Sequence, residues 1–471
     1  MKLVLPAAVL LLASAAAVPS ARAQTTATGR SSLGPISPFL GGVPTEKVTP
    51  EAIPIPILNA ITRALEHNLG VLNAEESVGR AQGARWTALA DLLPNVSGRI
   101  AENRQKVNLA AFGFPLPPGT PSLVGPFNVF DARVNVTQSV FDRRASSLAQ
   151  AENHRLAAAE LNVKSARDLV VIVSGNLYLE ALAAQARVDS ARAQLETAQA
   201  ILDQATQLKA SGIVAGIDVL RAQVQLGTEQ LRLTSATNDA ALTKLKLARV
   251  MGLPAGQAYT LSNDIPDLPS PDMTLEQAYE RALTTRPDYL AALERVKAAE
   301  ADRQGGASEY LPSVRVAGDY GTIGNTIGSA KGTYSVSGAV NVPIFNGGRT
   351  RGRLLQADAD LRMRRSEVED LKASIDYDVR ASFLELATTR EQLAVATRSR
   401  ELAAQQLTQA RDRFAAGVAS NVEIVQAQEA VAMSSEQYIS AAYGYNSAKG
   451  SLTRVLGTTE DLVRQLLGGV R

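Results

Sequence analysis

The sequence predicts a mainly α-helical protein with a membrane β-barrel portion, built from two tandem repeats of helix, strand, strand, long helix and helix. Three observations lead to this fold class. Several short motifs occur twice in the same order, long stretches contain no proline, and four short segments alternate apolar and polar residues. Because the motifs keep their order in both halves, we expect the halves to fold alike.

The first residues have the pattern of an export signal. Met1 and Lys2 precede an apolar run, and Ala21-Arg22-Ala23 fits the small-x-small rule of signal peptidase. The apolar run is shorter than the ~20 residues that a membrane-spanning helix needs, which disfavours an anchor helix. After residue 23 we expect no apolar run long enough to be a transmembrane helix. The exported chain is then periplasmic, secreted or an outer-membrane β-barrel.

Composition excludes several classes of protein. The 48 basic and 46 acidic residues nearly cancel, so no basic field suggests nucleic acid as a partner. The chain has no cysteine, and its two histidines, His67 and His154, are far apart. The sequence shows no phosphate-binding glycine loop and no nucleophile elbow. We therefore expect no catalytic residues, no metal, no cofactor and no enzyme activity.

The internal repeats define the organisation of the chain. Leu93-Pro94-Asn95-Val96 returns as Leu311-Pro312-Ser313-Val314, and Arg249-Val250-Met251-Gly252 returns as Arg454-Val455-Leu456-Gly457. Unrelated alanine-rich helices would not reproduce these motifs in one order. The expected segments are a signal peptide (1–23), an extended lead-in (24–54), a first repeat (55–252), a linker (253–273) and a second repeat (274–467).

Each repeat is expected to contain one very long helix and a shorter partner. In the first repeat these helices span about 142–210 and 217–250, and at ~1.5 Å per residue the longer one runs roughly 100 Å. Gly212 and Gly417 stand where the hairpins must turn. A heptad seam has alanine on one of its two rows, namely Ala191, Ala198, Ala205 and, in the second repeat, Ala396, Ala403, Ala410. A rod-like coiled-coil scaffold would show the same periodicity, so the strands must decide.

Four segments, near 95–100, 130–140, 313–320 and 333–344, alternate with period two. One face is apolar and the other carries charge, including Arg99, Arg133 and Arg315, which we expect in a barrel lumen. A soluble antiparallel sheet gives the same alternation, but export and the long helices favour the barrel. Single-chain barrels have at least eight strands, so the chain must oligomerise. We expect extracellular loops at 103–126 and 322–332.

This arrangement resembles the TolC family of outer-membrane efflux proteins over about 57–466. The most specific motifs are Leu92-Leu93-Pro94-Asn95-Val96-Ser97, Val342-Pro343-Ile344-Phe345-Asn346-Gly347-Gly348 and the two hairpin tips, 212–219 and 417–424. The resemblance implies a homotrimer with a twelve-stranded β-barrel in outer-membrane lipid and an α-helical coiled-coil tunnel through the periplasm. It also implies a passive conduit of a tripartite efflux or type I secretion system. Its partners would be a periplasmic adaptor (membrane fusion) protein and an inner-membrane pump, proton-driven or ABC-type.

The resemblance also implies a periplasmic constriction. Matched by alignment, Asp218 falls on an iris aspartate and Glu423 on an acidic ring, whereas Gln426 and Phe414 replace a second acidic ring and an iris tyrosine. Ala419 replaces the arginine partner, which puts the family's locking ion pair in doubt. Adaptor contact is expected at the hairpin tips, at Gly212, Ile213, Val214, Gly417 and Val418.

Two alternatives for these residues and for the chain stay open. Three copies of Glu423 around a narrow axis would favour cations and raise the pKa of the carboxylates. Asp218 and Glu423 also suit an N-terminal cap or the first turn of a helix. The whole chain could instead be a periplasmic coiled-coil adaptor or scaffold, although an adaptor should carry one hairpin and a soluble β-domain. The transported substrate is not encoded in these motifs.

Overall fold

The computed structural model describes residues 37–45, 47–113, 119, 121–262, 273–416, 418 and 421–459. The expected signal peptide lies outside these ranges. From Ser37 onward, the described residues form one compact unit.

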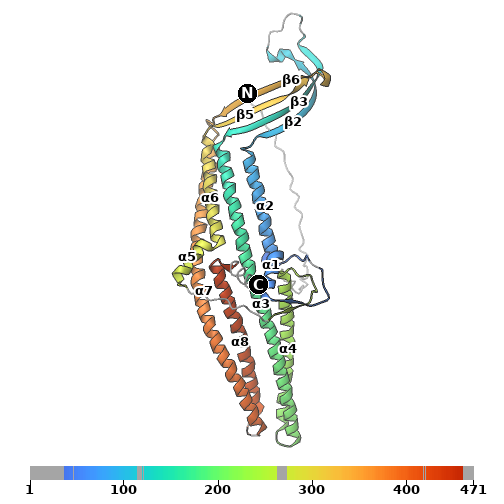
Figure 1. Cartoon of the computed structure of the whole chain (residues 1–471), viewed down its shortest axis with the longest axis vertical. Helices are drawn as coiled ribbons and strands as arrows, with labels where there is room; N and C mark the ends of the chain where they lie inside the picture. The colour runs from blue at the N-terminus through green and yellow to red at the C-terminus, as the bar shows by residue number, and fades with distance from the viewer. Residues whose placement is uncertain are drawn as a thin grey trace, which may run out of the picture. The chain divides into compact units, whose positions relative to one another are not determined.

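The two repeats have the same order of elements (Figure 1). The first repeat contains α1 (Ile57–His67), α2 (Leu69–Ala90), β2 (Asn95–Asn108), β3 (Leu123–Phe141), α3 (Arg143–Ala210) and α4 (Gly216–Val250). The second repeat contains α5 (Leu275–Thr285), α6 (Pro287–Ala307), β5 (Ser313–Gly324), β6 (Lys331–Asn341), α7 (Arg349–Ala415) and α8 (Asn421–Val455). The predicted tandem fold is confirmed, except that the first helix of each repeat is broken into two.

The smaller elements lie around these repeats. Two short strands, β1 (Ile53–Ile55) and β4 (Tyr259–Leu261), pair in parallel and connect the segments that flank the first repeat. The 3-10 helices are η1 (Pro38–Leu40), η2 (Leu109–Phe112), η3 (Ser308–Tyr310) and η4 (Ile327–Ser329).

The long helices α3 and α7 have 68 and 67 residues. Asp142 caps the start of α3, because its carboxylate accepts a 2.9 Å hydrogen bond from the Ala145 N–H. The helix ends at Ala210. Gly212, whose φ of +72° favours glycine, follows two residues later, and the Ile213 N–H donates to the Leu208 carbonyl at 2.9 Å. The absence of proline and these two end signals explain its unusual length.

Alanine rows hold each pair of helices together. α3 packs on α4, and α7 packs on α8. All six alanines of the predicted seam are at most 7 % exposed: Ala191, Ala198, Ala205, Ala396, Ala403 and Ala410. Their small side chains allow the helix axes to approach closely, which confirms the predicted coiled-coil packing.

The largest buried cluster lies where the two short strands meet the helices. It includes Ile55, Ile61, Tyr178, Leu247 and Met251, all of them buried. The Tyr178 hydroxyl lies 2.9 Å from the Ile55 carbonyl and accepts from the Ser262 N–H at 3.1 Å. This buried tyrosine ties α3 to the ends of both strands.

Within the described residues, α3 is a helix long and apolar enough to cross a membrane, by length and composition alone. The prediction that no such run follows the export signal is therefore wrong by that measure. The apolar part has another explanation, because Val170, Val171, Tyr178 and Ala181 are buried against neighbouring elements. A helix that passes through a protein core needs apolar side chains for the same reason as one in lipid.

The break between α1 and α2 is held by Asn68. Its fully buried side chain accepts from the Gly70 N–H and donates to the Phe39 carbonyl, both at 2.8 Å. Gly252 lies beside this break and has a φ of +66°. A Cβ at this position would lie 2.5 Å from the His67 Cβ.

We predict that Gly252→Ala lowers the free energy of unfolding by about 2 kcal/mol or more, because it combines left-handed strain with a steric clash. The expected result is a clear drop in the thermal unfolding midpoint. Gly256→Ala is the matched control, because Gly256 also has a positive φ, of +90°, but open space around it. Equal midpoints for the two variants would contradict the close approach at Gly252.

Candidate functional site

The four long strands form one antiparallel sheet in the order β2-β3-β5-β6. They extend beyond most of the predicted limits, so the loops predicted at 103–126 and 322–332 are shorter than expected. The last strand is the exception, because it ends at Asn341 instead of continuing to residue 344. Pro343, which lacks an N–H for strand pairing, lies two residues further on.

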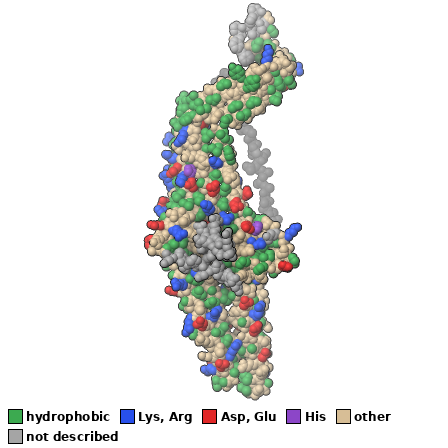
Figure 2. Space-filling view, viewed as in Figure 1, with side chains coloured by type: hydrophobic (Ala, Val, Ile, Leu, Met, Phe, Trp, Pro, Cys, Tyr) green, Lys and Arg blue, Asp and Glu red, His purple; other side chains and the backbone are tan. Residues whose placement is uncertain are grey.

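One face of this sheet is apolar and exposed. Side chains at Ile100, Tyr320, Tyr334 and Val336 are 71–79 % exposed, and the register places Tyr320 beside both Val134 and Tyr334. Hydrophobic side chains cover much of the sheet in view in Figure 2. A water-facing sheet rarely exposes so continuous an apolar surface, whereas a barrel strand in lipid requires one. This exposure favours the barrel over a soluble sheet.

The opposite face is polar. Arg133 pairs with Asp131 at 2.7 Å and with Asp319 at 2.8 Å, and these three side chains come from β3 and β5. Gly321 lies opposite Arg133, where a Cβ would come within 2.3 Å of the Arg133 Cβ, so glycine leaves the room that the arginine needs. Arg99 is directly opposite Arg133 on β2. The register also places Arg315 on this face, so all three predicted lumen arginines share it.

Both edges of the sheet are open in the described part of the chain. β2 pairs only with β3, and β6 pairs only with β5. An unpaired edge leaves backbone N–H and C=O groups without partners, which is unfavourable in lipid. The sheet is therefore a segment of a larger barrel.

At the other end of the long helices, an apolar cluster joins the two hairpins. We call it the tip cluster, and its buried members are Ile201, Ala205, Val219, Ala222, Ala410, Phe414, Ile424 and Ala427. Phe414 is only 2 % exposed. The phenylalanine therefore packs between the two hairpins of one protomer. In this apolar setting its ring needs no hydroxyl group.

The polar residues predicted at the constriction surround this cluster. Asp218, in the first turn of α4, pairs with Arg221 at 3.2 Å, and its carbonyl accepts a 2.8 Å hydrogen bond from the Asn421 amide. Glu423, in the first turn of α8, lies 3.4 Å from Arg413. The Asn421 bond crosses from one hairpin to the other. Each acidic candidate is thus offset by an arginine of its own hairpin, a pairing that the sequence analysis missed.

The other predicted tip residues have different environments. Ile213 and Val418 are 60 % and 67 % exposed, whereas Val214 packs against the tip cluster and Gln426 is exposed. Gly212 makes the turn after α3. Gly417 and Ala419 lie outside the described residues. Two apolar side chains therefore project from the hairpin ends.

Above the tips, ion pairs connect the hairpins. Arg232 of α4 reaches Glu429 of α8 at 3.2 Å, and Arg187 of α3 reaches Glu436 of α8 at 2.9 Å. Glu229 is buried beside Arg232, and burial raises the pKa of its carboxyl although the arginine opposes this effect. No motif marks the two pairs between hairpins, because their partners are 197 and 249 positions apart in the sequence.

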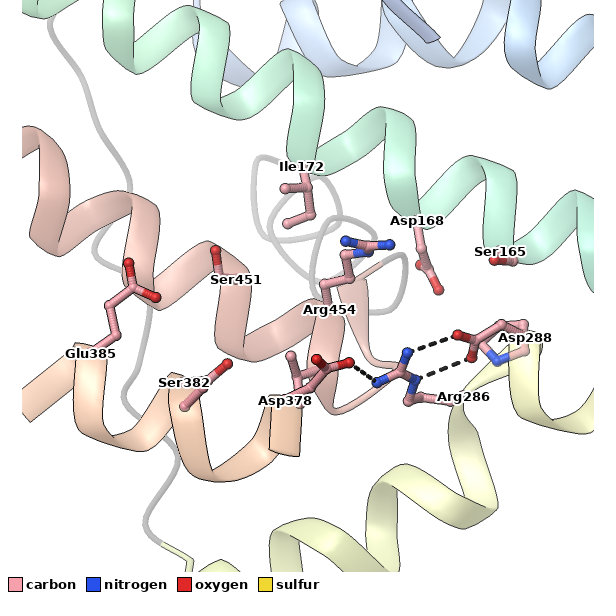
Figure 3. Close-up of a pocket in the computed structure, with 13 residues that line it drawn as sticks. Ser165, Asp168, Ile172, Arg286, Asp288, Asp378, Ser382, Glu385, Ser451 and Arg454 are labelled. Carbon is pink, nitrogen blue, oxygen red and sulfur yellow. Dashed lines mark hydrogen bonds and ion pairs between the residues drawn. The ribbon is translucent and has the colours of Figure 1, made fainter. Parts of the chain in front are cut away.

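A small polar pocket of about 200 Å³ lies where α3, α6, α7 and α8 meet, near the start of α6 (Figure 3). Arg286 extends between two carboxylates there, 2.7 Å from Asp288 and 3.0 Å from Asp378. Burial alone would raise the pKa of Asp288, but Arg286 holds that pKa below its usual value. These carboxylates are satisfied by the arginine, so the cluster joins helices. In the described ranges, no group of three His, Asp or Glu side chains could hold a metal ion.

Comparison with known proteins identifies the family. The family model described as outer membrane efflux protein matches residues 60–253 and 278–458, which is most of the chain. The chain belongs to the outer membrane efflux protein family.

Members of the outer membrane efflux protein family with similar sequences cover most of this chain. The pyoverdine export outer membrane protein OpmQ of Pseudomonas putida is 23 % identical over 84 % of both chains. The outer membrane protein TolC of Escherichia coli is 21 % identical over 71 % of this chain and 70 % of its own length. The solved structure of the Campylobacter jejuni CmeC outer membrane channel has a TM-score of 0.77 at 17 % identity, covering 92 % of this chain and 94 % of CmeC, and shows the same fold.

Membership of the outer membrane efflux protein family establishes the class and location of the protein. The chain is an outer-membrane efflux or secretion channel with a long periplasmic part. The periplasmic adaptor alternative finds no support, because both hairpins and the sheet belong to one efflux fold.

We predict that Glu423→Gln makes the channel more permeable to anions, because it removes the negative partner of Arg413 near the predicted constriction. Arg413→Gln should shift permeability toward cations. Both are measured as reversal potentials of single channels in planar bilayers under a KCl gradient. If neither variant moved the reversal potential, these residues would not lie at a conductance-limiting constriction.

Proposed function

We propose that three copies of this chain form a passive conduit from the periplasm to the cell exterior. The observation that supports this proposal most directly is the four-stranded sheet with an exposed apolar face and two open edges. Pairing β6 of one protomer with β2 of the next satisfies every edge, and three protomers then give twelve strands. The family resemblance supports three copies, since its channels are trimers.

The hairpins supply the tunnel in this proposal. Each protomer contributes four helices, α3, α4, α7 and α8, and three protomers contribute twelve around the axis. The tip cluster and the ion pairs to α8 keep the two hairpins of one protomer together. Asp218, Glu423, Gln426 and Phe414 then lie near the narrow periplasmic end.

The conduit has no catalytic activity of its own. An inner-membrane pump, proton-driven or ABC-type, supplies energy and chooses the cargo, and a periplasmic adaptor docks at the hairpin tips. The exposed Ile213 and Val418 at the hairpin ends are apolar and suit contact with an adaptor.

The trimer is tested by cross-linking the open edges. The chain has no cysteine, so a thiol-specific cross-linker reacts only with the cysteines that are introduced. We predict that Ser97→Cys/Ser337→Cys, with one thiol on β2 and one on β6, forms covalent dimers and trimers with a bis-maleimide in outer membranes, and nothing larger.

Each single-cysteine variant is the matched control and should give no trimer. A ladder that continued past three, or a purified chain that stayed monomeric and water-soluble without detergent, would refute the closed trimeric barrel.

We predict that Ile213→Asp abolishes export while leaving the trimer intact, because a charge at an apolar contact must be desolvated when the adaptor docks. Export is measured as survival of the native host on toxic pump substrates, and trimer formation as heat-modifiable migration on gels. Ile213→Val is the control and should export normally. Normal survival with Ile213→Asp would exclude this residue from the adaptor contact.

A further inference from the structure

We propose that this conduit prefers anions, because the polar face of its sheet carries an excess of positive charge and its hairpin tips carry no excess of negative charge. The inference rests on the proposed function, in which the polar faces of three copies line one lumen.

The register shows which charges share the polar face. Residues directly opposite each other project to the same side, so the odd-numbered positions of β3, β5 and β6 lie with Arg99 of β2. The charged residues on this face are Arg99, Arg133, Arg315, Lys331, Asp131 and Asp319. Four are positive and two are negative, which leaves two positive charges per protomer and six in a trimer.

The pairing within this set leaves three cations uncompensated. Both aspartates bind the same arginine, Arg133. Among the described residues, no acidic side chain lies within 4.0 Å of Arg99, Arg315 or Lys331, and all three are exposed. We call these three residues the basic set. Their charge is available to a solute in the lumen.

The basic set lies in the part of the sheet where all four strands pair. Arg315 follows the start of β5, Arg99 is level with Arg133 in mid-sheet, and Lys331 begins β6 opposite Ile323. Arg315 and the level of Arg99 are six residues apart on β5, or roughly 20 Å at ~3.3 Å per residue. Because this distance exceeds the ~8 Å Debye length, Arg315 attracts anions separately from Arg99 and Lys331, whose levels are only two residues apart.

The remaining strand charges do not oppose this field. Glu102 and Arg104 of β2 project to the other face, together with Ile100. They have opposite signs, and they lie on the lipid side of the sheet. Lys106 lies at the register shift between Gln105 and Val107, and its charge is positive, so it does not oppose the field either. Basic side chains that line a pore favour anions, and low-dielectric walls strengthen their field.

The hairpin tips, where an acidic ring would select cations, have no net negative charge. Residues 208–224 and 411–426 contain four basic and three acidic side chains: Lys209, Arg221, Arg411, Arg413, Asp218, Asp412 and Glu423. Asp218 and Glu423 are each paired with an arginine. The cargo class that suits both ends of the conduit is therefore anionic, such as solutes that carry carboxylates.

The test uses the full-length trimer in planar bilayers with KCl alone as the probe, because potassium and chloride have similar mobility. We expect the wild-type reversal potential under a KCl gradient to have the sign of chloride preference. Arg99→Gln/Arg315→Gln/Lys331→Gln should move it toward potassium preference, because one net negative charge per protomer then remains on the face. Arg315→Gln alone should give a smaller shift of the reversal potential in the same direction. This single variant provides the test if the triple variant fails to assemble.

Arg104→Gln is the matched control. It removes a positive charge from β2, the strand that carries Arg99, but from the lipid side of the sheet. Its reversal potential should equal that of the wild type. Potassium preference in the wild type, or equal shifts for Arg104→Gln and Arg315→Gln, would overturn the inference while leaving a working channel. An assembled trimer without any conductance would overturn the proposed function, and the inference with it.

Discussion

A strand edge inside a bilayer has no water to satisfy its backbone N–H and C=O groups, and this constraint governs the rest of the structure. The sheet of this chain has such an edge on both sides. It also has an exposed apolar face, which is unfavourable in contact with water. Neither problem can be solved within one copy of the chain. The membrane part therefore exists only as an assembly, and the other elements must bring several copies into register.

The long helices meet that requirement through close packing instead of large side chains. Rows of alanine on α3 and α7 let partner helices approach, and the tip cluster then joins one hairpin to the other. Ion pairs also join α8 to α3 and α4, between the two hairpins. An exposed pair of this kind contributes little to stability, typically below about 1 kcal/mol, but it does fix which helix faces which.

Much of this architecture could be predicted from the sequence, because periodicity and end signals are local. Period-two alternation placed all four strands, and the alanine heptads located the helix seam. Contacts between distant segments were less accessible. The pairing of Glu423 with Arg413, the network at Arg232 and the burial of Phe414 depend on how two hairpins approach, which no local pattern encodes. The helix breaks at Asn68 and Arg286 were also missed. Asn68 is not a helix breaker by itself, whereas Pro287, at the first position of α6, disfavours a helical Arg286 and was a local signal that the analysis did not use.

Those two breaks occupy equivalent positions in the two repeats, yet their chemistry differs. Asn68 closes the first with neutral amide hydrogen bonds, and Arg286 closes the second with a pair of carboxylates. A positive-φ glycine lies close to the break in both cases, Gly252 against His67 and Gly457 against the backbone of Arg286. Duplication has thus kept the bend and allowed its side chains to diverge. The two repeats can accordingly respond unequally to salt, although their backbones follow the same path.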